Sequence, residues 1–317
     1  MNYLLLAIGF VLLIAGADYL VRGASSVAKR LKISDLIIGL TVVSIGTSAP
    51  ELSVNIIASL DNAPGMAIGN VIGSNIFNFL LIIGFAAIVS PIGLKNSLLK
   101  IEIPFAILAS LALIFVASDT FFDSTPGLIT RSDGMILLLF FSIFMYYIFL
   151  SAKKGEIKEE EIIEKESNLS VWLSVIYIVG GLGALVFGGD LIVGSATELA
   201  VGWGMSETVI GLTIVATGTS LPELATSLVA AYKGNSDIAI GNVIGSNIFN
   251  IFLILGASSV ITPLPFAASS TIDALVAAAA TGVVLFFGYR GKGLKIDRKE
   301  GIILIVMYAA YITYLLV

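Results

Sequence analysis

The sequence predicts an all-α polytopic membrane protein whose ten transmembrane helices form two inverted-topology repeats of five. Three observations predict this fold class. Of the 317 residues, 57% are hydrophobic and 12% are charged, whereas soluble domains carry about 25% charged residues. The apolar residues form runs of about 20, the length that crosses a bilayer as a helix. The second half of the chain also repeats the first. This composition excludes a secreted, nucleic-acid-binding or soluble catalytic protein.

The apolar runs place the expected helices along the chain. We expect spans near residues 3–21, 35–59, 66–90, 100–118, 133–152, 171–193, 208–231, 238–261, 271–289 and 301–317. The runs are too long and too uniformly apolar for the alternating pattern of a transmembrane barrel. The chain then divides into a first five-helix repeat at 1–152, a linker at 153–170 and a second five-helix repeat at 171–317.

The internal repeat is unusually close. Residues 67–78 and 239–250 both read AIGNVIGSNIFN, and 11 of 21 positions agree between 39–59 and 211–231. Each copy holds five spans, an odd number, so the second copy must enter the membrane from the opposite side. Inverted repeats are typical of secondary transporters, whose substrate site lies near the bilayer midplane between the copies.

The basic residues predict the orientation in the membrane. Of the 17 Lys and Arg residues, 16 lie in connectors that follow odd-numbered spans, and only Arg131 lies on the other side. Cytoplasmic connectors carry the excess of basic residues, so we expect an integral cell-membrane protein with both termini outside. The linker at 153–170 is acidic and is then cytoplasmic. A regulatory Ca²⁺ sensor is the alternative interpretation of these acidic residues. The linker lacks the residue spacing and the glycine of a Ca²⁺-binding EF-hand loop, so we expect a solvated linker.

Two buried carboxylates are the strongest candidates for function. Cysteine and histidine are absent, which excludes thiol and imidazole chemistry and the usual zinc ligands. Any bound cation is therefore held by oxygen. Glu51 and Glu223 are repeat mates well inside spans two and seven, where a carboxylate costs about 2.5–3.5 kcal/mol to insert. This cost predicts a functional role for the pair.

A proline precedes each of these glutamates, in GTSAPE and GTSLPE. Proline removes a backbone donor and clashes with the carbonyl four residues earlier, so we expect the helices to open at Gly46 and Gly218. The opening frees carbonyl oxygens near Thr47 and Thr219. Together with hydroxyls and one carboxylate from each repeat, these form a hard oxygen site that suits Ca²⁺ better than Mg²⁺. A packing kink is the alternative interpretation.

The identical segments add neutral oxygen ligands. Their polar residues recur at i, i+4 and i+8 and so share one helix face. They are Asn70, Ser74 and Asn78 in span three, and Asn242, Ser246 and Asn250 in span eight. Asn55 and its mate Ser227 could extend these rows. Neutral oxygens suit a monovalent ion such as Na⁺, and interhelical hydrogen bonding is the competing interpretation.

Asp18 and Asp190 form a second acidic pair, nearer the ends of spans one and six. An ion-access vestibule and a hydrogen bond to a helix end are both compatible with their positions. An intramembrane aspartyl protease would need two neighbouring aspartates that share a proton, and it would leave the repeated glutamate, threonine and asparagine positions unused. We therefore expect no enzymatic activity.

The paired GTS-x-PEL and GNVIGSNIFN segments resemble the two alpha-repeats of the Ca²⁺/cation antiporter superfamily, most closely its Na⁺/Ca²⁺ exchanger branch of prokaryotic type. The resemblance covers nearly the whole chain. It implies that Glu51 and Glu223 are shared Ca²⁺ and Na⁺ ligands and that spans one and six slide across the bundle. The further ligands it implies are the carbonyls of Thr47 and Thr219, the side chains of Ser48, Ser220, Ser74, Ser246, Asn78 and Asn250, and the backbone at Ser44 and Ala216.

The function implied by the resemblance is secondary active exchange of Na⁺ for Ca²⁺ by alternating access. The expected partners are these two ions and the lipid bilayer, with no cofactor and no nucleic acid. Potassium-dependent relatives carry aspartate where this chain has Asn250, and cation/proton relatives carry an additional acid in the segment that here reads GNVIG at 69–73. The first departure disfavours K⁺ co-transport, and the second, together with the absence of histidine, favours Na⁺ over H⁺ coupling. A Ca²⁺/H⁺ antiporter and a passive Ca²⁺ channel are the alternatives.

Overall fold

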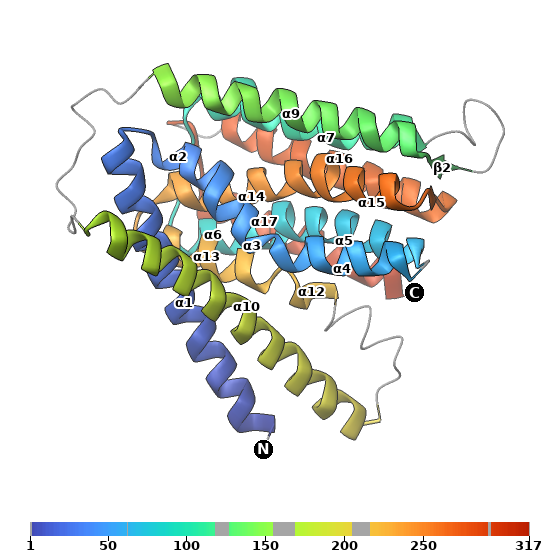
Figure 1. Cartoon of the computed structure of the whole chain (residues 1–317), viewed down its shortest axis with the longest axis horizontal. Helices are drawn as coiled ribbons and strands as arrows, with labels where there is room; N and C mark the ends of the chain where they lie inside the picture. Colours follow the sequence, from blue (N-terminus) through green and yellow to red (C-terminus); the bar gives the residue numbers. More distant parts are fainter. Residues whose placement is uncertain are drawn as a thin grey trace.

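The computed structural model describes residues 2–61, 63–117, 127–154, 169–204, 216–290 and 293–316. These residues form a helical bundle with two very short sheets (Figure 1). The first half contains α1 (Asn2–Leu31), α2 (Asp35–Ile38), η1 (Gly39–Val43), α3 (Ser44–Thr47), α4 (Ala49–Leu60), α5 (Pro64–Ile76), η2 (Phe77–Ile82), α6 (Ile83–Val89), β1 (Ile92–Gly93), η3 (Leu98–Glu102), α7 (Ile103–Ala117), β2 (Leu128–Ile129) and α9 (Arg131–Lys154). The second half contains α10 (Val171–Gly202), α12 (Ala216–Gly218), α13 (Leu221–Tyr232), α14 (Ser236–Phe249), η6 (Asn250–Leu255), α15 (Gly256–Ile261), β3 (Leu264–Pro265), α16 (Ala268–Arg290), β4 (Lys295–Ile296) and α17 (Arg298–Leu316). The elements named η are π-helical turns.

The prediction of a multi-pass helical membrane protein is confirmed. Within the described ranges, seven single helices are long and apolar enough to cross a membrane, and an eighth span results if the bent pair Asp35–Thr47 and Ala49–Leu60 is counted as one. The predicted span at 208–231 begins in residues outside the described ranges, and α17 covers the predicted last span. The count of ten therefore stays a prediction.

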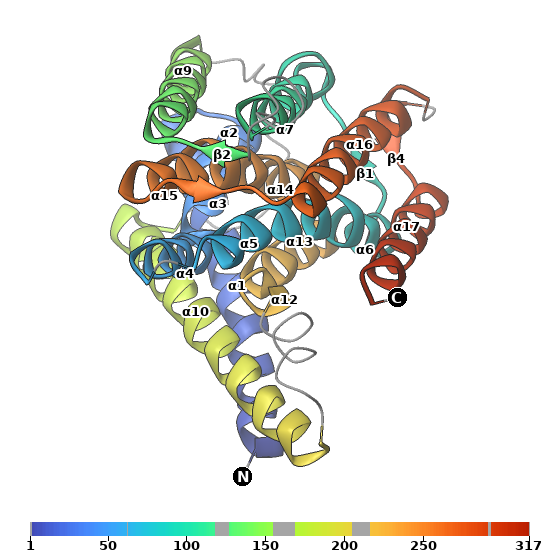
Figure 2. The same cartoon turned by 90° about the vertical axis from the view of Figure 1, so that its right-hand side faces the viewer.

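Helices α1 and α10 pack against each other in antiparallel directions and extend away from the rest of the bundle (Figures 1 and 2). A Cβ atom added at Gly9, Gly16 or Gly23 would lie 2.8–2.9 Å from a carbonyl oxygen of α10, at Gly188, Gly181 and Ser174. The three α1 positions are seven residues apart, two turns of helix. Small residues at this spacing allow two membrane helices to meet backbone to backbone.

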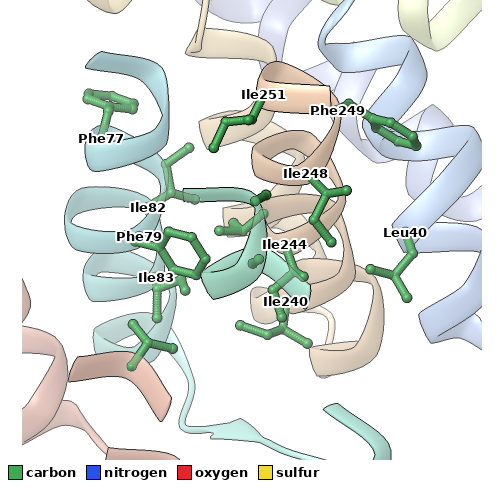
Figure 3. Packing of buried hydrophobic residues seen from close by; sticks show 14 of the residues in the cluster. Leu40, Phe77, Phe79, Ile82, Ile83, Ile240, Ile244, Ile248, Phe249 and Ile251 are labelled. Carbon is green, nitrogen blue, oxygen red and sulfur yellow. The ribbon is translucent and has the colours of Figure 1, made fainter. Parts of the chain in front are cut away.

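The centre of the bundle is formed by α5 and α14, the two helices that contain the identical segments. All residues of α14 from Ile238 to Phe249 are buried. Ile240, Ile244 and Ile248 recur every four residues along α14, and Figure 3 shows them between Leu40 of η1 and the side chains of η2 and α6. The helices at the periphery instead expose large apolar side chains, such as Trp172 of α10, as expected for surfaces that face lipid.

Each short sheet joins the two halves of the chain. Strand β1 pairs antiparallel with β4, and β2 pairs antiparallel with β3. Strands β1 and β3 occupy equivalent positions 172 residues apart, each just after a central helix. The two halves are therefore tied together at both ends of the central helix pair. The division into domains at 152 and 171 stays a prediction.

Both glutamate-bearing helices are interrupted just before their prolines. The segment Asp35–Thr47 is bent by 46° against Ala49–Leu60, and the break lies at Ser48, two residues after the predicted opening at Gly46. In the second half, α12 ends at Gly218, as predicted, and α13 begins at Leu221. A proline has no N–H for the preceding turn and is tolerated in the first turn of a helix. Each break therefore starts a new helix with the proline at its N-terminus.

Candidate functional site

The two glutamates begin the two new helices and face each other across the repeat boundary. Glu51 lies in the first turn of α4 and Glu223 in the first turn of α13, and each residue is only 1% exposed. A helix N-terminus presents unpaired N–H groups and a positive partial charge, which stabilises a carboxylate there. The break before each proline therefore makes it possible to bury a carboxylate at membrane depth.

Serine hydroxyls connect each glutamate to the opposite repeat. The Ser48 hydroxyl donates to Oε1 of Glu223 at 2.8 Å, and its mate Ser220 donates to Oε1 of Glu51 at 3.1 Å. The Ser246 hydroxyl lies 3.5 Å from Oε1 of Glu223. The hydroxyls of Ser220 and Ser74 are 3.0 Å apart. The structure thus brings together all six of these predicted site residues.

The two glutamates and the last asparagine of each predicted row have four buried oxygen atoms with no hydrogen-bond partner in the described part of the chain. They are Oε2 of Glu51, Oε2 of Glu223, Oδ1 of Asn78 and Oδ1 of Asn250. They form two pairs of repeat mates. A carboxylate or amide oxygen only accepts hydrogen bonds, and buried polar atoms almost always have partners. A bound cation would satisfy all four oxygens, so their chemistry fits a cation site.

The predicted threonines and the first asparagines of the rows bond to each other. The Thr47 hydroxyl donates to Oδ1 of Asn242 at 3.0 Å, and the Thr219 hydroxyl to Oδ1 of Asn70 at 3.3 Å. These amide oxygens therefore accept hydrogen bonds from threonines of the other half of the chain. Interhelical hydrogen bonding is the competing interpretation of the polar rows. Asn70 and Asn242 fix the threonines at the helix breaks, and their role as direct ligands stays a prediction.

The remaining predicted residues lie on the helices next to the two breaks. Ser44 is buried in α3, and its carbonyl oxygen accepts from the backbone N–H of Ser48. Ala216 begins α12. Asn55 donates to the Glu51 carbonyl at 2.9 Å, whereas Ser227 accepts from Asn242 at 3.1 Å. These contacts hold the backbone around the glutamates and leave the ligand roles of Ser44 and Ala216 as predictions.

The two ends of the site differ in exposure. Thr47 and Asn242 are fully buried, whereas their mates Thr219 and Asn70 are partly exposed. A Cβ atom added at Gly245 would lie 2.5 Å from the Ser44 hydroxyl oxygen. At its mate Gly73, no heavy atom of the described part of the chain lies within 4 Å of such a Cβ. Among the described residues, the surroundings of Thr47 are therefore more tightly packed than those of Thr219.

Asp18 and Asp190 lie outside this site and differ from each other. Asp18 pairs with Arg22 at 2.8 Å, between Oδ2 and Nε, and with the ammonium of Lys233, the C-cap residue of α13. This contact ties α1 to the end of α13, close to the helix-end interpretation. Asp190 is exposed on α10. Asp190 cannot form the equivalent ion pair, because the residue equivalent to Lys233 is Asp61.

Sequence reasoning missed Asn75 and Asn247, which are buried between the two identical segments. They lie between the positions of the predicted polar rows, so helical periodicity assigned them to another face. Their exact repetition within AIGNVIGSNIFN was the only available signal. The heptad spacing of Gly9, Gly16 and Gly23 was a second missed signal, because it marks the close contact with α10.

The arrangement defines a class of protein. In the described residues no group of three or more histidines, cysteines, aspartates or glutamates is close enough to hold a metal, so the site combines just two carboxylates with neutral oxygens. Such an arrangement, buried between the halves of a multi-pass membrane protein, fits a cation transporter. Neutral hydroxyl and amide oxygens around a pair of carboxylates suit Ca²⁺ or Na⁺.

The comparisons with known proteins identify the family. Residues 1–150 and 173–317 match the family described as "Sodium/calcium exchanger protein". The sodium/calcium exchanger MaX1 of Methanosarcina acetivorans is 36% identical over 345 residues, covering 99% of this chain and 98% of that protein. The inner membrane protein YrbG of Escherichia coli (strain K12) is 40% identical over 270 residues, covering 82% of this chain and 79% of that protein.

A solved structure agrees with this assignment. The sodium-calcium exchanger NCX_Mj, soaked with 10 mM Na⁺ and zero Ca²⁺, is similar with a TM-score of 0.84 and 34% sequence identity, covering 98% of both chains. The chain belongs to the sodium/calcium exchanger family and is a membrane transporter. This confirms the predicted family resemblance and the prediction that the protein is a transporter and not an enzyme.

Proposed function

We propose that the protein exchanges Na⁺ for Ca²⁺ by alternating access, with both ions competing for the site around Glu51 and Glu223. The observation that carries the proposal is the set of four buried oxygens without hydrogen-bond partners in the described part of the chain, two of which belong to these carboxylates. Exchange follows from the charge: a site with two unpaired buried carboxylates is costly, so each return movement requires a counter-ion.

The antiparallel packing of α1 against α10 supports the inverted relation of the two halves. These helices are repeat mates, and the reciprocal serine–glutamate hydrogen bonds relate the two halves in the same way. We further propose ten spans, both termini outside and a cytoplasmic linker at 153–170, as the distribution of basic residues predicts. In this scheme α1 and α10 move as a pair against the bundle.

Coupling to Na⁺ is tested with purified protein in proteoliposomes. We expect Ca²⁺ uptake into vesicles loaded with Na⁺, and a rate at least about tenfold lower in vesicles loaded with choline, because a counter-ion must occupy the carboxylates on the return. A third set of vesicles carries a pH gradient instead of the Na⁺ gradient. Uptake driven by the pH gradient alone would contradict Na⁺ coupling and favour Ca²⁺/H⁺ exchange. Equal uptake in all vesicles would indicate a passive channel.

The ion pair between Asp18 and Lys233 is expected to hold α1 against α13 in this conformation. The change Lys233→Gln removes this ion pair. The equivalent residues Asp190 and Asp61 are both acidic, so no such ion pair holds the opposite conformation. We expect the population in which α1 lies further from α13 to rise about threefold, the effect of one partly exposed ion pair. Spin labels on cysteines introduced at Leu4 and Tyr232, both exposed, report the distance, because the chain has no cysteine of its own.

The matched control for this experiment is Lys295→Gln. It breaks the ion pair between Lys295 and Asp297, whose atoms are 3.2 Å apart, at a position remote from α1. Its distance distribution should equal that of the parent. Identical distributions for Lys233→Gln and the parent would argue against a role of the ion pair in the position of α1.

A further inference from the structure

Asn75 and Asn247 occupy the crossing of the two central helices. Asn75 is the penultimate residue of α5 and precedes the π-helical turn η2, and Asn247 lies at the equivalent position near the end of α14, before η6. Both are buried. π-helical turns change the direction of the following side chains and often occur at functional sites. Asn75 and Asn247 therefore lie just before the turns that determine the directions of the predicted ligands Asn78 and Asn250.

The two asparagines bond to each other's backbone across the repeat boundary. Nδ2 of Asn75 donates to the carbonyl oxygen of Asn247 at 3.3 Å, and Nδ2 of Asn247 donates to the carbonyl oxygen of Asn75 at 3.4 Å. A backbone carbonyl can only accept a hydrogen bond. Each amide must therefore point its nitrogen toward the partner's backbone, and its own oxygen lies on the other side.

These oxygens in turn fix the amides of two predicted ligands. Oδ1 of Asn75 accepts from Nδ2 of Asn250 at 2.9 Å, and Oδ1 of Asn247 accepts from Nδ2 of Asn78 at 2.9 Å. Since the nitrogens of Asn78 and Asn250 are held in this way, their oxygens are left free. Those oxygens are two of the four buried acceptors at the candidate site without a hydrogen-bond partner in the described ranges.

We infer that Asn75 and Asn247 are positioning residues that lock the amides of Asn250 and Asn78 with oxygen toward the transported cation, and that they thereby set the affinity for Na⁺ relative to Ca²⁺. The inference rests on the proposed function. A flipped amide would present N–H groups, which repel a cation. A divalent ion is attracted to the two carboxylates more strongly than a monovalent one. The neutral amide oxygens therefore supply a larger share of the binding of Na⁺ than of Ca²⁺.

The pairing crosses between the repeats, which makes the test specific. The change Asn75→Ala releases the Asn250 amide in the other half of the chain, while Asn78, one turn away in the same half, stays held by Asn247. We expect the Na⁺ concentration for half-maximal Ca²⁺ uptake to rise about tenfold in Asn75→Ala, the effect of losing one buried hydrogen bond and its orientation. The KM for Ca²⁺ should change less than about threefold.

A double-mutant cycle separates positioning from general packing. If Asn75 acts through Asn250, adding Asn75→Ala to Asn250→Ala should not weaken the response to Na⁺ further. Adding Asn75→Ala to Asn78→Ala should be additive. Asn75→Ser is the rescue variant, because its uncharged hydroxyl can both accept from Asn250 and donate to the Asn247 carbonyl. It should retain more of the Na⁺ response than Asn75→Ala.

Each outcome decides the inference. A larger fold-change for Na⁺ than for Ca²⁺, with coupling to Asn250 and not to Asn78, would support it. Equal changes for both ions, or additivity with Asn250→Ala, would overturn it and leave a packing role only. If Asn75→Ala does not insert, Asn75→Ser and the equivalent Asn247→Ala with Asn78→Ala decide by the same criteria. Absence of Na⁺ dependence in the parent protein would instead overturn the proposed function.

Discussion

Replacing Glu51 or Glu223 with glutamine is expected to reduce Ca²⁺ uptake by at least about 100-fold, because it leaves a divalent cation with one carboxylate in a buried site. Glutamine has nearly the same shape as glutamate, and its Oε1 can still accept the hydrogen bond from Ser220 or Ser48. The change therefore removes charge with little change in packing. Uptake of radioactive Ca²⁺ into Na⁺-loaded proteoliposomes measures the effect.

The control for these variants is Glu198→Gln, which removes a carboxylate from an exposed position of α10. It should transport at the parent rate. Because Glu51 and Glu223 make reciprocal contacts, their two glutamine variants should be impaired to a similar degree. Substantial Ca²⁺ flux in a correctly inserted Glu51→Gln or Glu223→Gln protein would refute the proposed site.

The change Gly181→Leu is expected to abolish the accumulation of folded protein. A Cβ atom at Gly181 would lie 2.7 Å from the carbonyl oxygen of Gly16 and 2.8 Å from the backbone nitrogen of Leu20. Backbone atoms cannot move aside as a flexible side chain can, so α1 and α10 would have to separate. Overpacking of this kind costs about 3 kcal/mol or more. The yield of monodisperse protein after detergent extraction, and its thermal denaturation midpoint, measure the loss.

A matched substitution on the same helix distinguishes packing from helix propensity. Gly183 lies two residues further along α10, is exposed, and has no heavy atom of the described chain within 4 Å of an added Cβ. Gly183→Leu should therefore accumulate like the parent. If Gly181→Leu accumulates equally well, the close contact between α1 and α10 is not required for folding.

The sequence predicted the helices well in position and less well in length. Hydropathy ended the first span at residue 21, whereas α1 continues to Leu31 and ends on Lys29 and Arg30 in its last turn. Similarly, α10 continues to Gly202, beyond the predicted end at 193. Hydropathy reports where the chain meets lipid, and a helix continues past that point because its backbone hydrogen bonds do not depend on lipid.

The candidate site was predictable where depth and repetition coincided. Glu51 and Glu223 stood out because a buried carboxylate is costly and each one is repeated 172 residues away. Asn75 and Asn247 did not stand out, because a helical period places them off the face of Asn70, Ser74 and Asn78. Their role depends on which helix crosses them, and a one-dimensional pattern contains no information on that crossing.

By itself the sequence determined the membrane class, the two related halves and the oxygen chemistry of the site, since composition, repetition and the absence of histidine and cysteine are properties of the chain alone. Only the tertiary structure decided that Ser48 bonds Glu223 rather than Glu51, that each asparagine pair is fixed from the opposite half, and that Asp18 pairs with Lys233 while Asp190 stays exposed. The physical reason is that hydrogen bonds and ion pairs act over about 3 Å. Packing between helices distant in sequence sets which groups come within that range.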